Sequence, residues 1–294
     1  MTGAGISAAS GIPTFRGQDG FWKEQKRYVN ESDPTEVLRY SFFNEHPMAV
    51  WEWHYDFYKL MQGKEVNGGH TAISKFQAHC LQDSEMQSIL ITQNIDDLHC
   101  REIRKSPVLS KKKDALYMPT DENRAAFTPH CYEIHGNVHY MHCSEEEKEC
   151  SKTFLACPSL EEFDSAHQAA EEKTITLEDG TVQNFCLVPR CGECNAPMKP
   201  HSMFFDETYS EHYYRKDTVM NFVEQSDCLI VVGTALATNL AKQIVCHFLN
   251  AELPVIEVNL ESSIDRGNNI QVLEKSEVAL PALFEEYYRL KGAA

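Results

Sequence analysis

Three short apolar runs along the chain each end in polar or small residues. The runs are Ile89–Ile91 before Thr92 and Gln93, Leu229–Val232 before Gly233 and Thr234, and Val255, Ile256 and Val258 before Asn259. Continuous runs rich in β-branched residues are typical of parallel strands covered on both faces. Helical patterns at about 217–225 and 237–249 lie between two of these runs. The alternation predicts an α/β fold built on a doubly wound parallel sheet.

The polar residues after these runs share one predicted position. The carboxyl ends of parallel strands meet at the same edge of a sheet, and ligands bind outside that edge. The predicted edge collects Gln93, Asn94, Asp96, Gly233, Thr234 and Asn259. Each tail taken alone is an ordinary turn, whereas the group together favours a nucleotide site.

The chain opens with the glycine-rich stretch MTGAGISAASGIPTFRG. The spacing of Gly3 and Gly5 lets backbone N–H groups approach a bulky anion, as in a dinucleotide-binding turn. Ser7 and Ser10 are candidates to cap the start of the helix that follows. A G-x-G alone is a weak signal, so this loop gains meaning only from its surroundings.

Composition narrows the class of protein. The chain has 294 residues, 42% of them hydrophobic, which allows one large domain with a smaller insert. Its formal net charge of −17 disfavours direct binding to DNA or RNA. No apolar run approaches the length of a membrane span, and no secretory signal is visible. We therefore expect an intracellular protein, cytoplasmic or nuclear, with no direct nucleic-acid or membrane partner; its oligomeric state stays open.

The 11 cysteines point to a metal rather than to disulfides. Cys191-Gly-Glu-Cys194 is a C-x-x-C knuckle, and Cys143 with Cys150 would complete a four-thiolate zinc site. Further candidate ligands are Cys157, Cys186, His139 and His142. A redox pair or buried reduced thiols are the alternatives. The surrounding segment, 137–200, is rich in glutamate and shows little strand pattern, so it is predicted to be a small insert held together by metal.

Several of these segments together resemble one family, the sirtuins, from residue 1 to about residue 285. In order they are GAGISAASGIPTFRG, TQNIDDLH, EIHGN, the paired cysteines, KPHSMFFDE, VVGTAL and VIEVN. The resemblance implies a Rossmann-like NAD-binding domain, expected at 1–135 and 201–294, and a small zinc-binding domain at 136–200. It also implies an NAD-dependent protein lysine deacylase, with NAD and acyl-lysine meeting between the domains. The products would be nicotinamide, free lysine and O-acyl-ADP-ribose, and the cofactors NAD and Zn2+.

The resemblance also assigns site residues. His135 would act as the base on a ribose hydroxyl, a role that suits an imidazole near neutral pH. Asn94 and Asp96 are the other expected catalytic residues and, with Gln93, would form the ribose and nicotinamide pocket. The expected cofactor-binding residues are Gly3, Ala4, Gly5, Thr14, Phe15, Arg16, Trp22, Gln93, Asn94, Asp96, Gly233, Thr234, Ala235, Asn259 and Glu261. Two alternatives keep part of this chemistry. One is transfer of ADP-ribose to a protein or nucleotide, and the other is a non-catalytic NAD-binding or zinc scaffold.

Departures from the family pattern carry their own expectations. Only Met1 and Thr2 precede the glycines, so the first strand of the sheet is apparently missing. Its two neighbours are then expected to lie unpaired along their full length, and the chain to be a truncated one that folds poorly or binds NAD weakly.

The substrate side departs as well. His54 and Phe57 replace the Tyr and Arg of the succinyl-specific sirtuins, so acetyl or apolar acyl groups are expected. Asp206 stands where most relatives carry Gly, which is expected to narrow the approach of the peptide. The lysine-rich insertion between Asp97 and His135 is predicted to be a solvated loop.

Overall fold

The computed structural model describes residues 1–14, 35–110, 130–145, 148–170, 174–176, 182–184, 188–265, 267 and 269–292. The chain divides into two compact units. The first unit comprises Met1–Asp19, Lys64–Gly136 and Tyr209–Ala294, and the second comprises Gly20–Gly63 and Asn137–Thr208. The second unit thus includes 20–63, which the sequence places with the NAD-binding domain; the predicted domain boundaries stay a prediction. Within the described ranges, no helix has the length and apolarity to cross a membrane.

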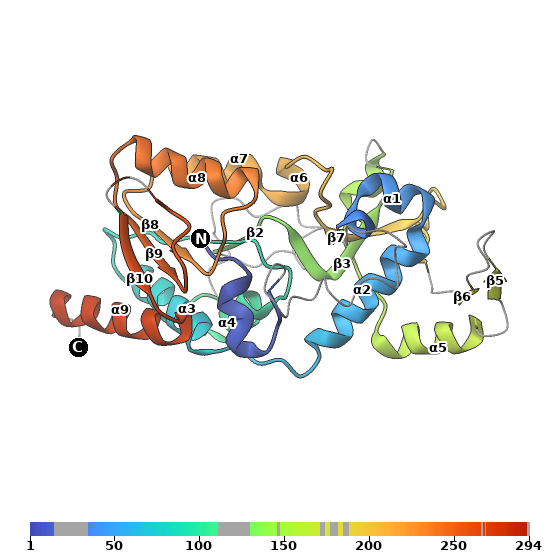
Figure 1. Cartoon of the computed structure of the whole chain (residues 1–294), viewed down its shortest axis with the longest axis horizontal. Helices are drawn as coiled ribbons and strands as arrows, with labels where there is room; N and C mark the ends of the chain where they lie inside the picture. The colour runs from blue at the N-terminus through green and yellow to red at the C-terminus, as the bar shows by residue number, and fades with distance from the viewer. Residues whose placement is uncertain are drawn as a thin grey trace. The chain divides into compact units, whose positions relative to one another are not determined.

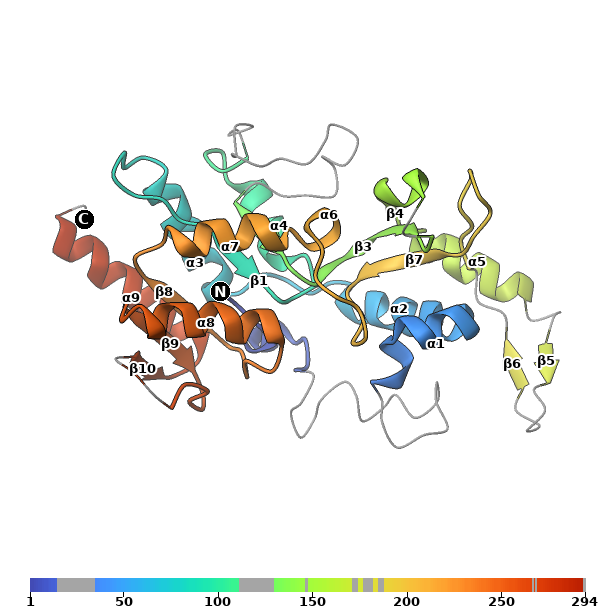
Figure 2. The same cartoon turned by 90° about the horizontal axis from the view of Figure 1, so that it is seen from above.

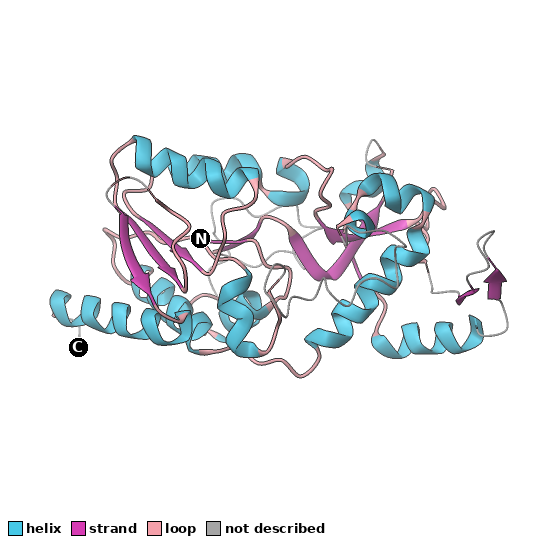
Figure 3. Cartoon of the chain, in the orientation of Figure 1, coloured by secondary structure: helices cyan, strands magenta, loops and turns pink. Residues whose placement is uncertain are grey.

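The first unit is built on parallel strands (Figures 1 and 3). β1 (Leu90–Thr92) pairs with β2 (Cys131–Glu133), and β8 (Leu229–Val232), β9 (Val255–Asn259) and β10 (Asn269–Leu273) form a second ladder with β9 in the middle. Every one of these pairings is parallel. β1, β8 and β9 cover the three apolar runs of the sequence, and the predicted doubly wound α/β class is confirmed.

Helices cover both faces of this sheet, which explains the continuous apolar run of β8. Leu229 and Val231 of β8 point into one core cluster with α7 (Lys216–Glu224) and α8 (Asn239–Asn250). Val232, on the other face, packs with α3 (Gly68–Cys80), α4 (Leu98–Lys105) and α9 (Ser276–Lys291). Figure 1 shows α7 and α8 on one side of the strands and α3 and α9 on the other.

The first three residues lie between β1 and β8. The amide of Thr2 donates to the carbonyl of Ile91 at 2.8 Å, and the amide of Gly3 donates to the carbonyl of Val232 at 2.9 Å. Thr2 forms parallel bridges to Thr92 on one side and to Val232 on the other. The expectation that both neighbouring strands lie unpaired along their full length is therefore wrong, because these residues satisfy backbone groups on each side.

The glycine loop continues as a short 3-10 helix, η1 (Ala4–Ser10). A Cβ atom on Gly5 would lie 2.7 Å from the Cα of Gly233, and one on Gly233 would lie 2.6 Å from the amide nitrogen of Ile6. The glycines thus permit backbone to pack on backbone. Ser7 and Ser10 lie inside η1 and do not cap it, which corrects that prediction. Ser10 instead accepts a hydrogen bond from Asn67, which itself caps α3.

The second unit contains strands that the hydrophobic pattern of the sequence does not predict. β3 (Gly136–Cys143) lies between β4 (Leu155–Ala156) and β7 (Met198–Ser202), and β5 (Thr174–Thr176) pairs with β6 (Val182–Asn184) (Figure 2). Its helices are η3 (Glu36–Leu38), α1 (Tyr40–Glu45), α2 (Pro47–Met61), η5 (Glu149–Lys152) and α5 (Leu160–Ala170). The segment 137–200 therefore contains strands although its sequence shows little strand pattern. β3 and β7 are buried but polar in sequence (GNVHYMHC and MKPHS), so hydrophobic patterning does not reveal them.

Candidate functional site

The polar residues that follow β1 come together with the glycine loop in the first unit. The side-chain amide of Asn94 donates to the carbonyl of Gly3 and to the hydroxyl of Ser7, both at 3.1 Å. The hydroxyl of Ser7 donates to the carboxylate of Asp96 at 2.6 Å. These three side chains are buried. Burial raises the pKa of Asp96, and the hydrogen bonds from Ser7 and from the amide of Leu98 partly offset that rise.

His135 lies two residues after the end of β2, and its protonation state follows from its partners. Nδ1 is 2.9 Å from the carbonyl oxygen of Gln93, and Nε2 is 2.8 Å from the hydroxyl of Tyr209. A carbonyl only accepts, so Nδ1 carries the hydrogen. Burial lowers the pKa of His135 to about 4, so the ring is neutral at pH 7 and Nε2 presents its lone pair. The Tyr209 hydroxyl is therefore the donor to Nε2.

The turns after β8 and β9 complete the group. The side-chain amide of Gln93 donates to the hydroxyl of Thr234 at 2.9 Å. Asn259 donates to the carbonyl of Thr234 at 3.0 Å. Gly233 has φ +57°, which a side chain would strain, and it sits against Gly5. Three strand ends and the glycine loop are thus linked within one unit.

Not every expected residue joins this group. Within the described part of the chain, Thr14, Ala235 and Glu261 form no hydrogen bond with the residues of this group. Ala235 and Glu261 are exposed. Phe15, Arg16 and Trp22 lie outside the described residues, as does 111–129 of the predicted solvated loop.

Four cysteines gather in the second unit. The Sγ atoms of Cys143, Cys150, Cys191 and Cys194 all lie within 4.8 Å of one another. Cys143 Sγ is 3.4 Å and Cys150 Sγ is 3.7 Å from Cys194 Sγ. Tetrahedral Zn–S bonds of about 2.3 Å place the sulfurs roughly 3.8 Å apart, so the cluster fits a zinc ion. These are the four ligands that the sequence nominates.

The C-x-x-C knuckle has the local structure of a thiolate site. The amide of Asn195 donates to the carbonyl of Cys191 at 2.9 Å, closing the turn. A backbone N–H donated by Cys194 lowers the pKa of the Cys191 thiol to about 7, although burial acts in the opposite direction. The alternative ligand Cys157 lies beside His54, with its Sγ 3.6 Å from Nε2. Cys186 lies outside the described part of the chain.

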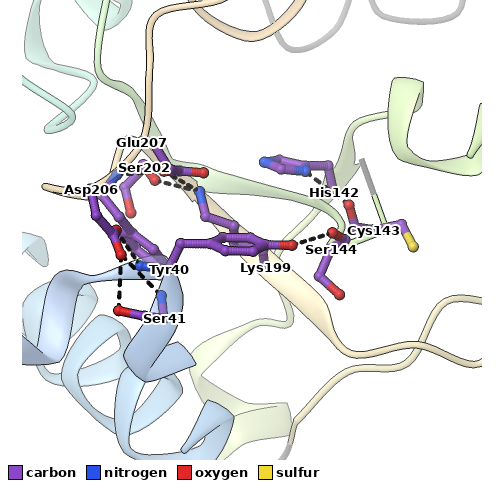
Figure 4. A network of polar contacts seen from close by, with 10 residues as sticks. Tyr40, Ser41, His142, Cys143, Ser144, Lys199, Ser202, Asp206 and Glu207 are labelled. Carbon is purple, nitrogen blue, oxygen red and sulfur yellow. Dashed lines mark hydrogen bonds and ion pairs between the residues drawn. The ribbon is translucent and has the colours of Figure 1, made fainter. Parts of the chain in front are cut away.

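A buried ion pair organises the loop after β7 in the second unit (Figure 4). The Lys199 ammonium is fully buried, 2.9 Å from the carboxylate of Glu207 and 2.8 Å from the carbonyl of Ser202. It also lies 4.1 Å from the ring centroid of Phe204. The charge therefore has an opposite charge, an acceptor and an aromatic face.

Asp206 holds the same loop to α1. Its carboxylate accepts hydrogen bonds from the amides of Tyr40 and Ser41 and from the Ser41 hydroxyl (Figure 4). Burial alone would raise the pKa of Asp206, but these donors hold it below its usual value. The carboxylate thus caps a helix that begins 166 residues earlier in the chain.

Two polar partners of the site escaped the sequence patterns. Ser7 is expected only as a helix cap, yet it links Asn94 to Asp96. Tyr209 stands in YSEHYY, where its aromatic neighbours suggest packing alone, yet it bonds His135. Its only sequence signal is a place shortly after KPHSMFFDE, which specifies no partner.

Comparison with known proteins agrees with this α/β fold and its polar strand ends. A family model described as the Sir2 family matches residues 3–105 and 120–239, and the chain belongs to that family. It is 30% identical over 264 residues to the NAD-dependent protein deacylase sirtuin-5, mitochondrial, of Danio rerio, covering 89% of this chain and 73% of that protein. It is 29% identical to an NAD-dependent protein deacylase of Pyrococcus abyssi, covering 90% and 81%. A solved structure of a Sir2 homolog–NAD complex superposes with a TM-score of 0.65 at 23% identity, covering 98% of this chain and 88% of that one.

Proposed function

We propose that this chain is an NAD-dependent protein lysine deacylase, with His135 as the base and Asn94 and Asp96 as residues that orient the ribose. The observation that carries the proposal is the state of His135. The ring is neutral, its Nδ1–H donates to the Gln93 carbonyl, and its Nε2 lone pair accepts a hydrogen bond from a hydroxyl, that of Tyr209. A general base needs this form of the imidazole. Membership of the Sir2 family and relatives named as NAD-dependent protein deacylases support the same reaction.

His135, Asp96 and the four clustered cysteines have different roles in this proposal. Bound NAD supplies a ribose carbon from which nicotinamide departs. His135 accepts a proton from a ribose hydroxyl at Nε2. Hydrogen bonds from Ser7 and from the amide of Leu98 fix the orientation of the Asp96 carboxylate. The carboxylate of Asp96 and the carboxamide of Asn94 can both form hydrogen bonds with the hydroxyls of a ribose. In the second unit the four cysteines would hold zinc as a structural ion.

Nicotinamide release tests the reaction class. The full-length protein is incubated with NAD, with and without an acetyl-lysine peptide, and the products are identified by mass spectrometry. Release that requires the peptide, together with O-acyl-ADP-ribose and free lysine, is the expected result. Release without peptide but with labelled protein would replace the proposal with ADP-ribosyl transfer. If zinc-loaded protein releases no nicotinamide with or without peptide, the non-catalytic scaffold would replace the proposal.

We also propose that acetyl or apolar acyl groups are preferred over succinyl. His54 and Phe57 on α2 are both buried, and burial lowers the pKa of His54 to about 3, so neither side chain offers a positive charge. A succinyl carboxylate would find no guanidinium at these two positions. Initial rates on matched acetyl- and succinyl-lysine peptides decide the point. Faster turnover of the succinyl peptide would reverse the assignment.

An intracellular setting, cytoplasmic or nuclear, and the absence of nucleic-acid or membrane partners belong to the same proposal. The ten cysteines in the described part of the chain form no disulfide, and the four clustered thiols require reducing conditions to hold a metal. The net charge of −17 opposes contact with phosphate backbones. Fractionation of cells that express the tagged protein tests the location.

A further inference from the structure

The base nitrogen of His135 already has a hydrogen-bond donor within the first unit. The Tyr209 hydroxyl lies 2.8 Å from Nε2, and the two rings are 5.9 Å apart between centroids with an interplanar angle of 32°. Because Nδ1 donates to the Gln93 carbonyl, Nε2 is the acceptor and the phenol is the donor. A neutral imidazole nitrogen has one lone pair in the plane of the ring, so it accepts one good hydrogen bond at a time.

Tyr209 is held in this place by contacts of its own. Its ring packs against the apolar cluster formed by the sheet with α7 and α8. A side-chain hydrogen bond with Thr238 lowers the pKa of Tyr209, although the larger effect, burial, raises it overall. The Thr238 hydroxyl is also 3.3 Å from the side-chain carbonyl of Gln93. Because a hydroxyl has one hydrogen, Thr238 donates either to Gln93 or to the phenol oxygen at a given moment.

We propose that Tyr209 is a positioning residue whose hydroxyl covers Nε2 of His135 and must yield when a ribose hydroxyl donates to that nitrogen. The inference rests on the proposed role of His135 as base. Two hydroxyl donors cannot share the single lone pair, so the phenol and the substrate compete for it. While the phenol is in place, it also holds the imidazole plane from the side opposite the Gln93 carbonyl. No proton moves to or from Tyr209; its hydrogen bond is exchanged for another.

The competition affects only the step that uses Nε2. Nicotinamide departs before the base acts, so its exchange is independent of the phenol. The step that follows benefits when the competitor is removed. A typical hydrogen bond within a protein, net of solvent, corresponds to about a two- to tenfold effect. We therefore expect Tyr209→Phe to raise the ratio of deacylation to nicotinamide exchange by about two- to tenfold.

The first test is spectroscopic and needs no substrate. Nitrogen-15 spectra of the histidine rings are recorded at pH 7.5 for the full-length protein and for Tyr209→Phe, with His135 assigned from the spectrum of His135→Gln. The phenylalanine keeps the ring and its packing. Tyr213→Phe is the matched control, because Tyr213 is a buried tyrosine four residues further along the chain, and its ring contacts His212 and Tyr214. We expect the Nε2 resonance to move downfield, toward the value of a lone pair without a donor, only in Tyr209→Phe. An unmoved Nε2 resonance overturns the proposal.

The second test is kinetic and separates this inference from the proposed function. Deacylation and labelled-nicotinamide exchange are measured for wild type, Tyr209→Phe and Tyr213→Phe. A raised deacylation-to-exchange ratio in Tyr209→Phe alone supports the exchange of hydrogen bonds. An unchanged or lowered ratio, with wild type active, overturns it while leaving the proposed function intact. An inactive wild type in which Nε2 still responds to Tyr209→Phe would instead overturn the proposed function. If Tyr209→Phe does not fold, Thr238→Val is used instead, because it removes the hydroxyl that holds the phenol. The Nε2 resonance is then expected to move in the same direction. An unmoved resonance would contradict the proposal.

Discussion

The two units of this chain place their polar groups differently. The first unit buries two apolar clusters on the two faces of a parallel sheet, and its polar side chains gather where the strands end. The second unit also buries large apolar side chains, among them Trp51, Trp53 and Phe163. Unlike the first unit, it has short strands of polar sequence, four clustered thiols and a buried ion pair.

The chain provides a probe that distinguishes the units. Trp51 and Trp53 lie on α2 of the second unit and are almost completely buried. The third tryptophan, Trp22, lies outside the described residues, so emission is recorded in a Trp22→Phe background, where it reports the second unit. Amide hydrogen exchange of β1, β8 and β9 reports the first unit.

Loss of the metal is expected to have the largest effect, and to affect the second unit only. Apparent binding free energies of structural zinc are about 10–16 kcal/mol in small domains. Cys194→Ser, or a strong chelator, should unfold the second unit at 25 °C and change the emission of Trp51 and Trp53. The strands of the first unit should keep their protection. Cys228→Ser, at an exposed cysteine before β8, is the control and should change neither readout. Simultaneous loss of protection in both units would show that they are not independently ordered.

Substitution of the proposed base should have the converse pattern. His135→Ala is expected to slow deacylation by about 10²- to 10⁴-fold, the usual contribution of a general base. Zinc content and tryptophan emission should not change. His247→Ala, on α8 and away from the strand ends, should keep full activity. Activity of His135→Ala within tenfold of wild type would remove His135 from the mechanism.

Breaking the buried ion pair should destabilise the second unit. Lys199→Met leaves the carboxylate of Glu207 without its cation, which typically costs about 3–5 kcal/mol. The double variant Lys199→Met with Glu207→Gln leaves no buried charge, and Gln retains an acceptor for the amide of Phe204, so most of the loss should be recovered. Urea unfolding followed by tryptophan emission measures both. Equal losses in the single and double variants would mean that packing, and not charge, dominates.

Acid should weaken the first unit through its buried histidines. Burial lowers the pKa of His70 to about 4, against about 6.5 when unfolded, so the folded state binds fewer protons between these values. The stability from this group is present above about pH 6.5 and is lost as pH falls toward 4, by roughly 2 kcal/mol between pH 7 and pH 5. Hydrogen exchange of β1 and β8 at the two pH values, compared with His70→Asn, measures the difference. An identical pH dependence in the variant would contradict the assignment.

The smallest effect is expected at Asp206. Asp206→Ala removes the carboxylate that caps α1, and loss of such a cap costs about 1 kcal/mol. Asp206→Asn should retain part of the cap, because the side-chain carbonyl still accepts from an amide. The free energy of unfolding, measured in urea by tryptophan emission, is expected to fall from wild type to Asp206→Asn to Asp206→Ala. A stability of Asp206→Ala equal to that of wild type would mean that water replaces the cap without cost.

The two units also differ in how well the sequence predicts them. β8 and β9 are evident because strands covered on both faces leave continuous apolar runs. The four cysteines are evident because a C-x-x-C knuckle with a second pair of cysteines is typical of a zinc site. β3 and β7 are not, since they bury polar residues such as His142 and Lys199 and therefore leave no apolar run in the sequence. A strand whose buried positions are apolar is visible in the sequence. A strand that buries polar side chains is not, because the contacts that satisfy those side chains are seen only in the structure.

The same reasoning applies within the site. Gln93, Asn94 and Asp96 follow a recognisable strand, so their gathering could be anticipated. The contact of Tyr209 with His135 joins residues 74 apart in sequence, and nothing in a phenol distinguishes a packing role from a polar one.

The close approach of Gly5 and Gly233 has a consequence for how this molecule can change over time. Each glycine occupies the space that a methyl group on the other would need, so neither position can be altered alone without forcing two backbone segments apart. A saturation-mutagenesis library should therefore show Gly5 and Gly233, which are 228 residues apart (233 less 5), as intolerant positions. A second-site suppressor of either would have to move a loop, since neither glycine has a side chain to shorten.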